Sequence, residues 1–175
     1  VAVIFGDGAG AAIISKTNDD KGILSSHLHS EGKYAKELWL ETPSSKLNPR
    51  FSDDLIKDGS HFLKMNGREV FKNAVRRFPE VILEALNSNN LDVNDIDLLI
   101  PHQANLRITQ MIQKKLKLDD SKVFSNIHKF GNTTAASVPI ALAEANEKKL
   151  IKDNDIVLLA AFGSGFAWGS TLIKW

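Results

Sequence analysis

The stretch DLLIPHQANLRITQMIQKKL, residues 97–116, places an apolar strand directly before a helix. Residues 97–100 are short and mostly apolar, which is typical of a strand buried on both faces. Residues 105–116 have apolar and basic side chains in a pattern that predicts a helix. A strand followed by a helix is the building unit of α/β sheets, and such sheets bind ligands at the carboxyl ends of their strands.

The rest of the chain repeats this alternation. A helix is predicted over 67–87, where Phe71, Val75 and Phe78 fall on one face, and another over 133–148, whose alanine-rich composition indicates a central position. We predict strands over 1–5, 11–14, 23–29, 123–125, 156–162 and 166–174, and a long irregular excursion over 30–60. The fold class is therefore α/β, a single domain with a mixed sheet and helices on both faces.

Composition excludes several classes of protein. The 175 residues are 43% hydrophobic and 25% charged, and the net charge is +1, so bulk charge supports neither nucleic-acid nor membrane-surface binding. No apolar run reaches the roughly 18 residues of a membrane span. The chain contains no cysteine, which excludes disulfides and any chemistry by a thiolate of its own.

The sequence pattern predicts a strand that starts at the first residue, with no polar segment before it. Val1–Phe5 is apolar, but Gly6 and Asp7 interrupt the run at once, so it does not have the form of a signal peptide. We interpret the sequence as one part of a longer protein.

Two glycine turns follow predicted strands, at Gly6–Gly10 and at Gly163–Gly165. A nucleotide-binding loop requires a helix after its glycines, whereas both turns precede predicted strands. Tight strand-to-strand turns are therefore favoured. Their backbone N–H groups could still face an anion that develops in a reaction.

His102 and Asn132 each follow a predicted strand and precede a helix. Spacing alone favours a structural reading, with His102 a hydrogen-bonded loop residue and Asn132 a turn residue or helix cap. The functional reading is that a neutral imidazole and a carboxamide both donate to one carbonyl oxygen. Two such donors would stabilise an enolate or oxyanion.

Five sequence blocks resemble one enzyme family, in the same order. PHQANLRI (101–108) closely resembles the histidine motif of β-ketoacyl-acyl carrier protein synthase III, and HKFGNTTAASVP (128–139) resembles its asparagine motif. Further matching blocks are FGDGAGAA (5–12), GREVFK (67–72) and AFGSGFAWG (161–169). The resemblance covers the C-terminal half of the family's chain.

The resemblance implies a thiolase-like fold, in which two similar halves build an αβαβα sandwich. Residues 1–175 would form the single C-terminal domain, and the N-terminal half with the catalytic cysteine would be absent. The implied activity is the cytoplasmic condensation of an acyl-coenzyme A primer with malonyl-acyl carrier protein, which starts type II fatty-acid synthesis. The isolated chain would be inactive.

The resemblance also implies roles for individual residues. His102 and Asn132 would belong to a Cys-His-Asn catalytic set, and the backbone N–H of Ser164, where many members have glycine, would contact an oxyanion. The implied coenzyme A channel comprises Gly67, Arg68, Phe71, Ala104, Asn105 and Phe162. The implied docking surface for the acidic carrier protein comprises Lys72, Arg107, Lys114 and Lys115.

Partners and alternatives follow from the same reading. The expected partners are acyl-coenzyme A, malonyl-acyl carrier protein, the N-terminal half and a second copy of the full-length enzyme. No cofactor is expected, because acyl-coenzyme A is a substrate, and no metal, because His27 and His29 lack an evident third ligand. The alternatives are a starter-specific condensing enzyme of polyketide or alkylquinolone synthesis, and a non-catalytic module that binds carrier protein. A nucleic-acid binder is disfavoured, because the basic helix has few aromatic residues.

Overall fold

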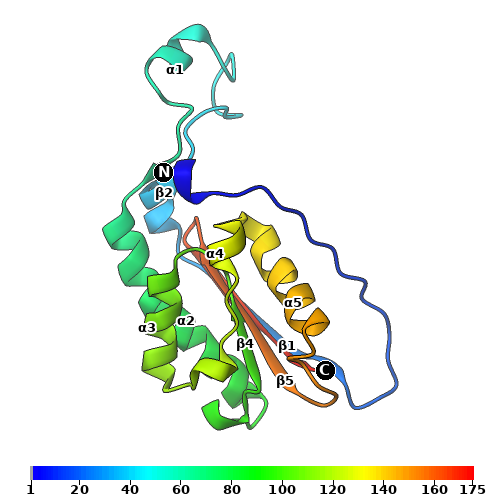
Figure 1. The fold of residues 1–175 in the computed structure, drawn as a ribbon. Helices are drawn as coiled ribbons and strands as arrows, with labels where there is room; N and C mark the ends of the chain where they lie inside the picture. The colour runs from blue at the N-terminus through cyan, green and yellow to red at the C-terminus, as the bar shows by residue number, and fades with distance from the viewer. Residues whose placement is uncertain (1) are drawn as a thin grey trace.

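A four-stranded mixed sheet forms the centre of the chain (Figure 1). The computed structural model describes residues 2–175. The strands are β1 (Gly22–Ser30), β4 (Leu98–Pro101), β5 (Ile156–Gly163) and β6 (Ala167–Lys174), and their order in the sheet is β1-β6-β5-β4. β4 and β5 run parallel, whereas β6 is antiparallel to both β5 and β1. The predicted mixed α/β sheet is confirmed.

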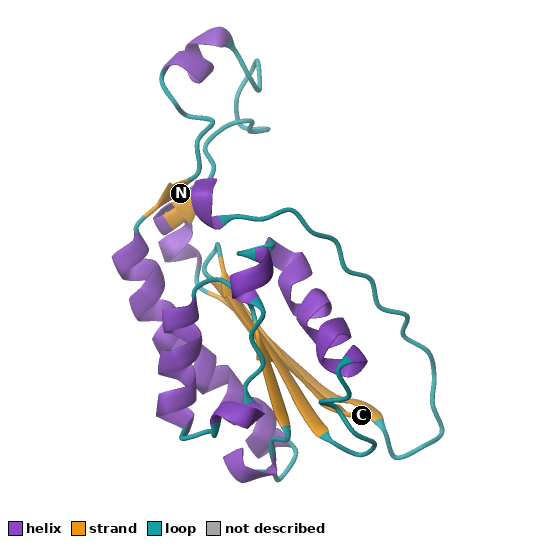
Figure 2. Cartoon of the chain, in the orientation of Figure 1, coloured by secondary structure: helices purple, strands orange, loops and turns teal. Residues whose placement is uncertain are grey.

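Helices cover both faces of this sheet (Figure 2). α2 (Gly67–Ser88) and α3 (Leu106–Leu116) lie on one face, and α5 (Ser137–Glu147) lies on the other. An asparagine caps the N-terminus of α2 and another caps that of α3. The side-chain Oδ1 of Asn66 accepts from the Glu69 N–H at 3.5 Å, and that of Asn105 accepts from the Arg107 N–H at 2.9 Å. These caps satisfy backbone donors that have no partner within the helix.

Strand β4 is buried on both faces, as its sequence predicts. Leu99 packs in the core between the sheet and helices α2 and α3, together with Phe78. Leu98 and Ile100 belong to the second core, under Ala141 of α5. Successive side chains of a strand point to opposite faces, so one short apolar run supplies both cores. Burying each such side chain fully contributes about 1.5–3 kcal/mol.

The excursion leaves the fold next to the amino end of α2. Its base is a two-stranded pair, β2 (Leu38–Trp39) with β3 (Lys64–Met65), and it carries the short helix α1 (Asp53–Lys57). A 3₁₀ helix at Gly32–Glu37 leads into it. The predicted irregular region is therefore confirmed in outline, although part of it is regular.

The strands predicted over 1–5 and 11–14 are not found among residues 2–14. Val1 lies outside the residues that the structure describes. Ala2–Ile4 forms a 3₁₀ helix, and Phe5 makes one isolated bridge, to Asn132. Residues 6–20 contain no strand, and Ile13 is 99% exposed. A β-branched apolar run becomes a strand only beside another strand, and no strand within residues 2–175 pairs with this segment.

Two further predictions need correction. The predicted strand over 123–125 is a single bridge between Val123 and Leu99, followed by α4 (Ile127–Phe130). The predicted helix over 133–148 begins as a 3₁₀ turn, and α5 itself starts at Ser137. Thr134 has φ of +52°, which is incompatible with a continuous α-helix. Within residues 2–175, we find no helix that combines the length and the apolar character needed to cross a membrane.

Candidate functional site

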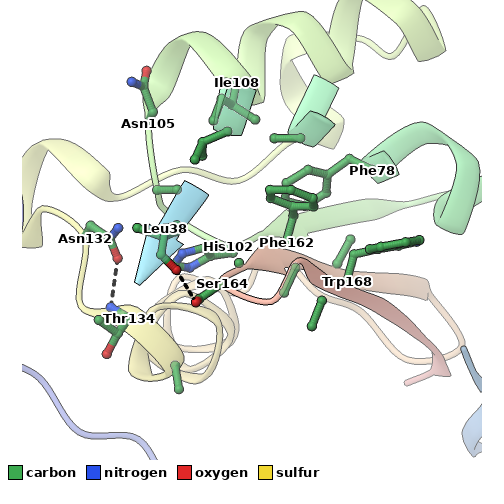
Figure 3. A pocket seen from close by; sticks show the side chains of 18 of the residues that line it. Leu38, Phe78, His102, Asn105, Ile108, Asn132, Thr134, Phe162, Ser164 and Trp168 are labelled. Carbon is green, nitrogen blue, oxygen red and sulfur yellow. Dashed lines mark hydrogen bonds between the residues drawn. The ribbon is translucent and has the colours of Figure 1, made fainter. Parts of the chain in front are cut away.

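A cavity of about 970 Å³ opens at the carboxyl ends of β4 and β5 (Figure 3). His102 and Asn132 both line it, as does Ser164. Its apolar wall includes Leu38, Phe71, Phe78, Ile108, Phe162 and Trp168. The structure thus brings His102, which follows β4, and Asn132, which follows α4 rather than the predicted strand, to one largely apolar cavity, the usual setting of a small-molecule site.

His102 is held where β4 ends. Its backbone N–H donates to Ala160 O of β5 at 2.8 Å, and its ring Nδ1 lies 2.6 Å from Ser137 Oγ. Burial lowers the pKa of the His102 imidazole from 6.5 to about 4, because the charged form loses its hydration. At neutral pH the ring is therefore uncharged and carries a single proton.

Gln103, which follows His102, links the end of β4 to the loop at 125–126. The sequence analysis did not identify this residue. The side chain is 1% exposed; its Nε2 donates to Pro101 O at 2.7 Å, and its Oε1 accepts from Ser125 Oγ at 2.8 Å and from Asn126 N–H at 3.2 Å. These bonds tie the end of β4 to the loop that leads to Asn132. The available signal was a polar amide at the second position after a buried strand, where a buried side chain is stable only when it is hydrogen-bonded.

Asn132 presents its amide nitrogen to the cavity. Its Oδ1 accepts from Thr134 N–H at 2.9 Å, and only the oxygen of a carboxamide can accept this bond (Figure 3). The Asn132 Nδ2 group has no hydrogen-bond partner among residues 2–175. The Thr134 backbone that donates this hydrogen bond has a φ of +52°, in the left-handed region. Such a conformation costs a β-branched residue about 1–3 kcal/mol.

A charged cluster centred on Glu144 packs beside the loop that carries Asn132. The buried Asn126 donates from Nδ2 to Glu144 Oε2 at 2.9 Å, and Glu144 also forms salt bridges with Lys129 and with Lys148. Hydrogen bonds from Lys129, Lys148 and Asn126 lower the pKa of the Glu144 carboxyl to about 2. The cluster joins α4 to α5 on either side of the segment that carries Asn132.

Ser164 lies in the turn between β5 and β6. Its hydroxyl donates to Leu38 O, so the serine side chain ties this turn to β2 (Figure 3). Gly163 and Ser164 are both lining residues of the cavity. A glycine would leave the same N–H in place without this bond.

The other predicted site residues divide into those in the cavity and those outside it. Five of the six implied channel residues line it: Gly67, Phe71, Ala104, Asn105 and Phe162. Arg68 is exposed in the first turn of α2 and is not a lining residue.

The implied docking residues lie on α2 and α3. Arg107 and Lys114 are exposed on α3, and Lys72 on α2 lies 3.8 Å from Glu69. Lys115 differs from the other three, because its Nζ donates to Val75 O at 3.0 Å and so fastens α3 to α2.

The histidine pair on β1 has a carboxylate neighbour that the sequence did not reveal. Glu84 of α2 lies 3.4 Å from His27 Nδ1 and 2.6 Å from His29 Nε2. Across the described part of the chain, no group of three potential ligands is arranged to hold a metal ion.

Comparison with known sequences decides the family. Residues 86–175 match the family described as 3-Oxoacyl-[acyl-carrier-protein (ACP)] synthase III C terminal. The chain belongs to this family. Residues 1–32 also match the family described as 3-Oxoacyl-[acyl-carrier-protein (ACP)] synthase III. The resemblance noted from the five sequence blocks is thus confirmed.

Relatives of the synthase III family match nearly the whole chain. β-Ketoacyl-[acyl-carrier-protein] synthase III of Clostridioides difficile is 47% identical over 99% of this chain and 52% of its own length. The protein of the same name from Caldanaerobacter subterraneus is 46% identical over 99% of this chain and 52% of its own. The chain therefore spans about half the length of the curated relatives that it matches.

A solved structure of the family has the same fold. The synthase III of Thermus thermophilus superposes with a TM-score of 0.88 at 41% identity, over 99% of this chain and 52% of that one. The expected thiolase-like α/β half is therefore confirmed.

Proposed function

We propose that residues 1–175 form the C-terminal domain of a decarboxylating condensing enzyme. The full protein would join an acyl-coenzyme A primer to malonyl-acyl carrier protein and so initiate type II fatty-acid synthesis. The observation that carries the proposal is the pairing of a neutral His102 and an Asn132 with a free amide group in one cavity. Membership of the synthase III family supports it.

The nucleophile of this reaction would come from outside the chain, which contains no cysteine. A cysteine thiolate of the N-terminal half attacks the acyl-coenzyme A carbonyl, the thioester C–S bond breaks, and coenzyme A leaves as its thiolate. The N-terminal half is thus the first partner of this domain. As in the family, the full-length enzyme would be a homodimer.

His102 and Asn132 would act in the second step. The malonyl thioester loses carbon dioxide, and the electron pair of the broken C–C bond passes to the thioester carbonyl oxygen as an enolate. His102 and Asn132 each donate a hydrogen bond to that oxygen. The enolate carbon then attacks the acyl-enzyme carbonyl, and the cysteine leaves as thiolate. Removing one donor of this kind typically costs about 2.7–4 kcal/mol of barrier.

A neutral histidine suits this role. The low pKa of His102 keeps the ring unprotonated at physiological pH, so it donates a hydrogen bond without delivering a proton to the enolate carbon or oxygen. The backbone N–H of Ser164 would contact the second oxyanion, which forms when the acyl-enzyme carbonyl is attacked.

The substrates would enter past the ends of α2 and α3. The channel would use Gly67, Phe71, Ala104, Asn105 and Phe162, all of which line the cavity. Exposed Arg107, Lys114 and Lys72 would attract the acidic carrier protein by charge. Lys115 would contribute less, because its ammonium is already bound to Val75 O.

The test separates the two steps in the protein that carries this chain. We expect Asn132→Ala to abolish condensation, by at least about 10²-fold, while acylation of the cysteine by acyl-coenzyme A continues. His128→Ala is the matched control, because His128 is an exposed residue of the same sequence motif, and we expect full activity from it. Equal loss of both steps in Asn132→Ala would argue for a structural role. Absence of any condensation by the unaltered protein would favour the module that only binds carrier protein.

A further inference from the structure

Ser137 connects His102 to the backbone of the following residue. Ser137 is the first residue of α5 and is 2% exposed. Its Oγ lies 2.6 Å from His102 Nδ1 and 3.2 Å from the backbone nitrogen of Gln103. No other hydrogen-bond partner of this hydroxyl occurs within residues 2–175.

The proton count at this hydroxyl distinguishes the two tautomers of His102. A serine hydroxyl has one hydrogen to donate and can accept through its oxygen. The Gln103 N–H can only donate, so Ser137 Oγ must accept that bond. If His102 Nδ1 carried the ring proton, both neighbours would be donors, and the buried hydroxyl hydrogen would have no acceptor. If Nδ1 is unprotonated, the hydroxyl donates to it, and all three groups are satisfied.

The donor that decides the matter is rigidly held. Gln103 is anchored through its side chain to Pro101 O, Ser125 and Asn126, so its N–H cannot turn away from Ser137 without breaking that set. The alternative in which the ring takes a second proton is also disfavoured. His102 is largely buried, and Ser137 begins α5, whose positive dipole end repels a cation.

We infer that Ser137 is a positioning residue that holds His102 in the tautomer protonated at Nε2. Nε2–H is then the one ring donor, and it is available to a carbonyl oxygen in the cavity. Nδ1 is fully used by the serine. The catalytic meaning of this tautomer rests on the proposed function, whereas the tautomer itself is a property of the folded chain.

The test is nitrogen NMR of the protein that carries this chain, labelled with ¹⁵N-histidine, at neutral pH. The chain has five histidines, and the His102 signals are assigned by their loss in His102→Gln. We expect one His102 nitrogen, Nε2, to resonate as a protonated ring nitrogen and Nδ1 as an unprotonated one. The spectrum of the protein with Ser137 unchanged is therefore a sufficient test. A ring proton at Nδ1, or averaged shifts for both His102 nitrogens, would overturn the inference.

The serine's own part is tested by two variants. In Ser137→Ala the two His102 nitrogen shifts should move toward each other, because both tautomers become populated. Ser170→Ala is the control: it removes another buried hydroxyl, one that donates to Val81 O and contacts neither the histidine nor Gln103, and the His102 shifts should keep their wild-type separation. An unchanged His102 spectrum in Ser137→Ala would show that the serine does not select the tautomer.

This experiment is independent of turnover. If the expected tautomer is found but the intact protein does not condense its substrates, the role of Ser137 stands and the proposed function fails. If condensation is found but the ring proton lies on Nδ1, the proposed function stands and the role of Ser137 fails.

Discussion

Gly6 and Asn132 are joined through their backbones, although they lie far apart in the sequence. The Gly6 N–H donates to Asn132 O at 3.0 Å, and the Asn132 N–H donates in turn to Ile4 O at 3.0 Å. A Cβ atom placed on Gly6 would lie 2.0 Å from Phe130 O. The segment that begins at Gly6, which forms no strand-to-strand turn in the structure, therefore supports the candidate site as a close neighbour of the asparagine loop.

Gly6→Ala should displace the loop that carries Asn132. The added methyl group cannot coexist with the Phe130 carbonyl, so one of the two segments must move. We expect condensation by the intact protein to fall by about 10²-fold, the typical effect of a misplacement of about 1 Å at a reacting centre. Gly32→Ala is the control, because a Cβ there meets nothing within 4 Å. Equal activity of the two variants would contradict the supporting role of Gly6.

The low pKa of His102 should appear in the stability of the chain. The unfolded chain binds a proton at this histidine near pH 6.5, but the folded chain only near pH 4. Unfolding is therefore accompanied by proton uptake in this window, and the free energy of unfolding falls as the pH is lowered through it. The His102 contribution is about 3 kcal/mol at most, at about 1.4 kcal/mol per pKa unit. Urea denaturation from pH 7 to pH 4 should show a shallower pH dependence in His102→Gln than in wild type.

Glu144→Ala should destabilise the fold around the asparagine loop. The change leaves the buried Asn126 amide without its acceptor, a loss of about 1–3 kcal/mol. It also removes the salt bridges to Lys129 and Lys148. Chemical denaturation measures the effect, and Glu147→Ala on the same helix is the control, since no ion pair of Glu147 is found among residues 2–175. A Glu144→Ala variant as stable as Glu147→Ala would mean that the cluster adds nothing.

The chain by itself should not become acylated. Formation of an acyl-enzyme thioester requires a thiolate, and these 175 residues contain no cysteine. Incubation of the isolated chain with radiolabelled acetyl-coenzyme A, followed by a denaturing gel, should leave the protein band unlabelled. Covalent label on this chain would show that a different nucleophile operates.

Much of the fold follows from local sequence patterns. The apolar runs at 97–100 and 156–162 and the helical spacing of Phe71, Val75 and Phe78 predicted their elements because each pattern matches the period of its structure. The N-terminal run was predicted wrongly by the same rule. Its residues suit a strand, but a strand also needs a neighbour, and neighbours are not encoded locally.

The sequence alone determined the α/β class, the family and the two candidate residues, His102 and Asn132, because the strand end before His102 and the motif blocks that carry both residues are contiguous in the chain. Only the tertiary structure decided that both residues line one cavity and that burial keeps the histidine neutral. It alone placed Ser137 against the imidazole, Gln103 between two loops and Lys115 on a backbone carbonyl. The physical reason is that desolvation and hydrogen-bond partnership depend on atoms brought together from distant segments, and no local pattern records which segments will meet.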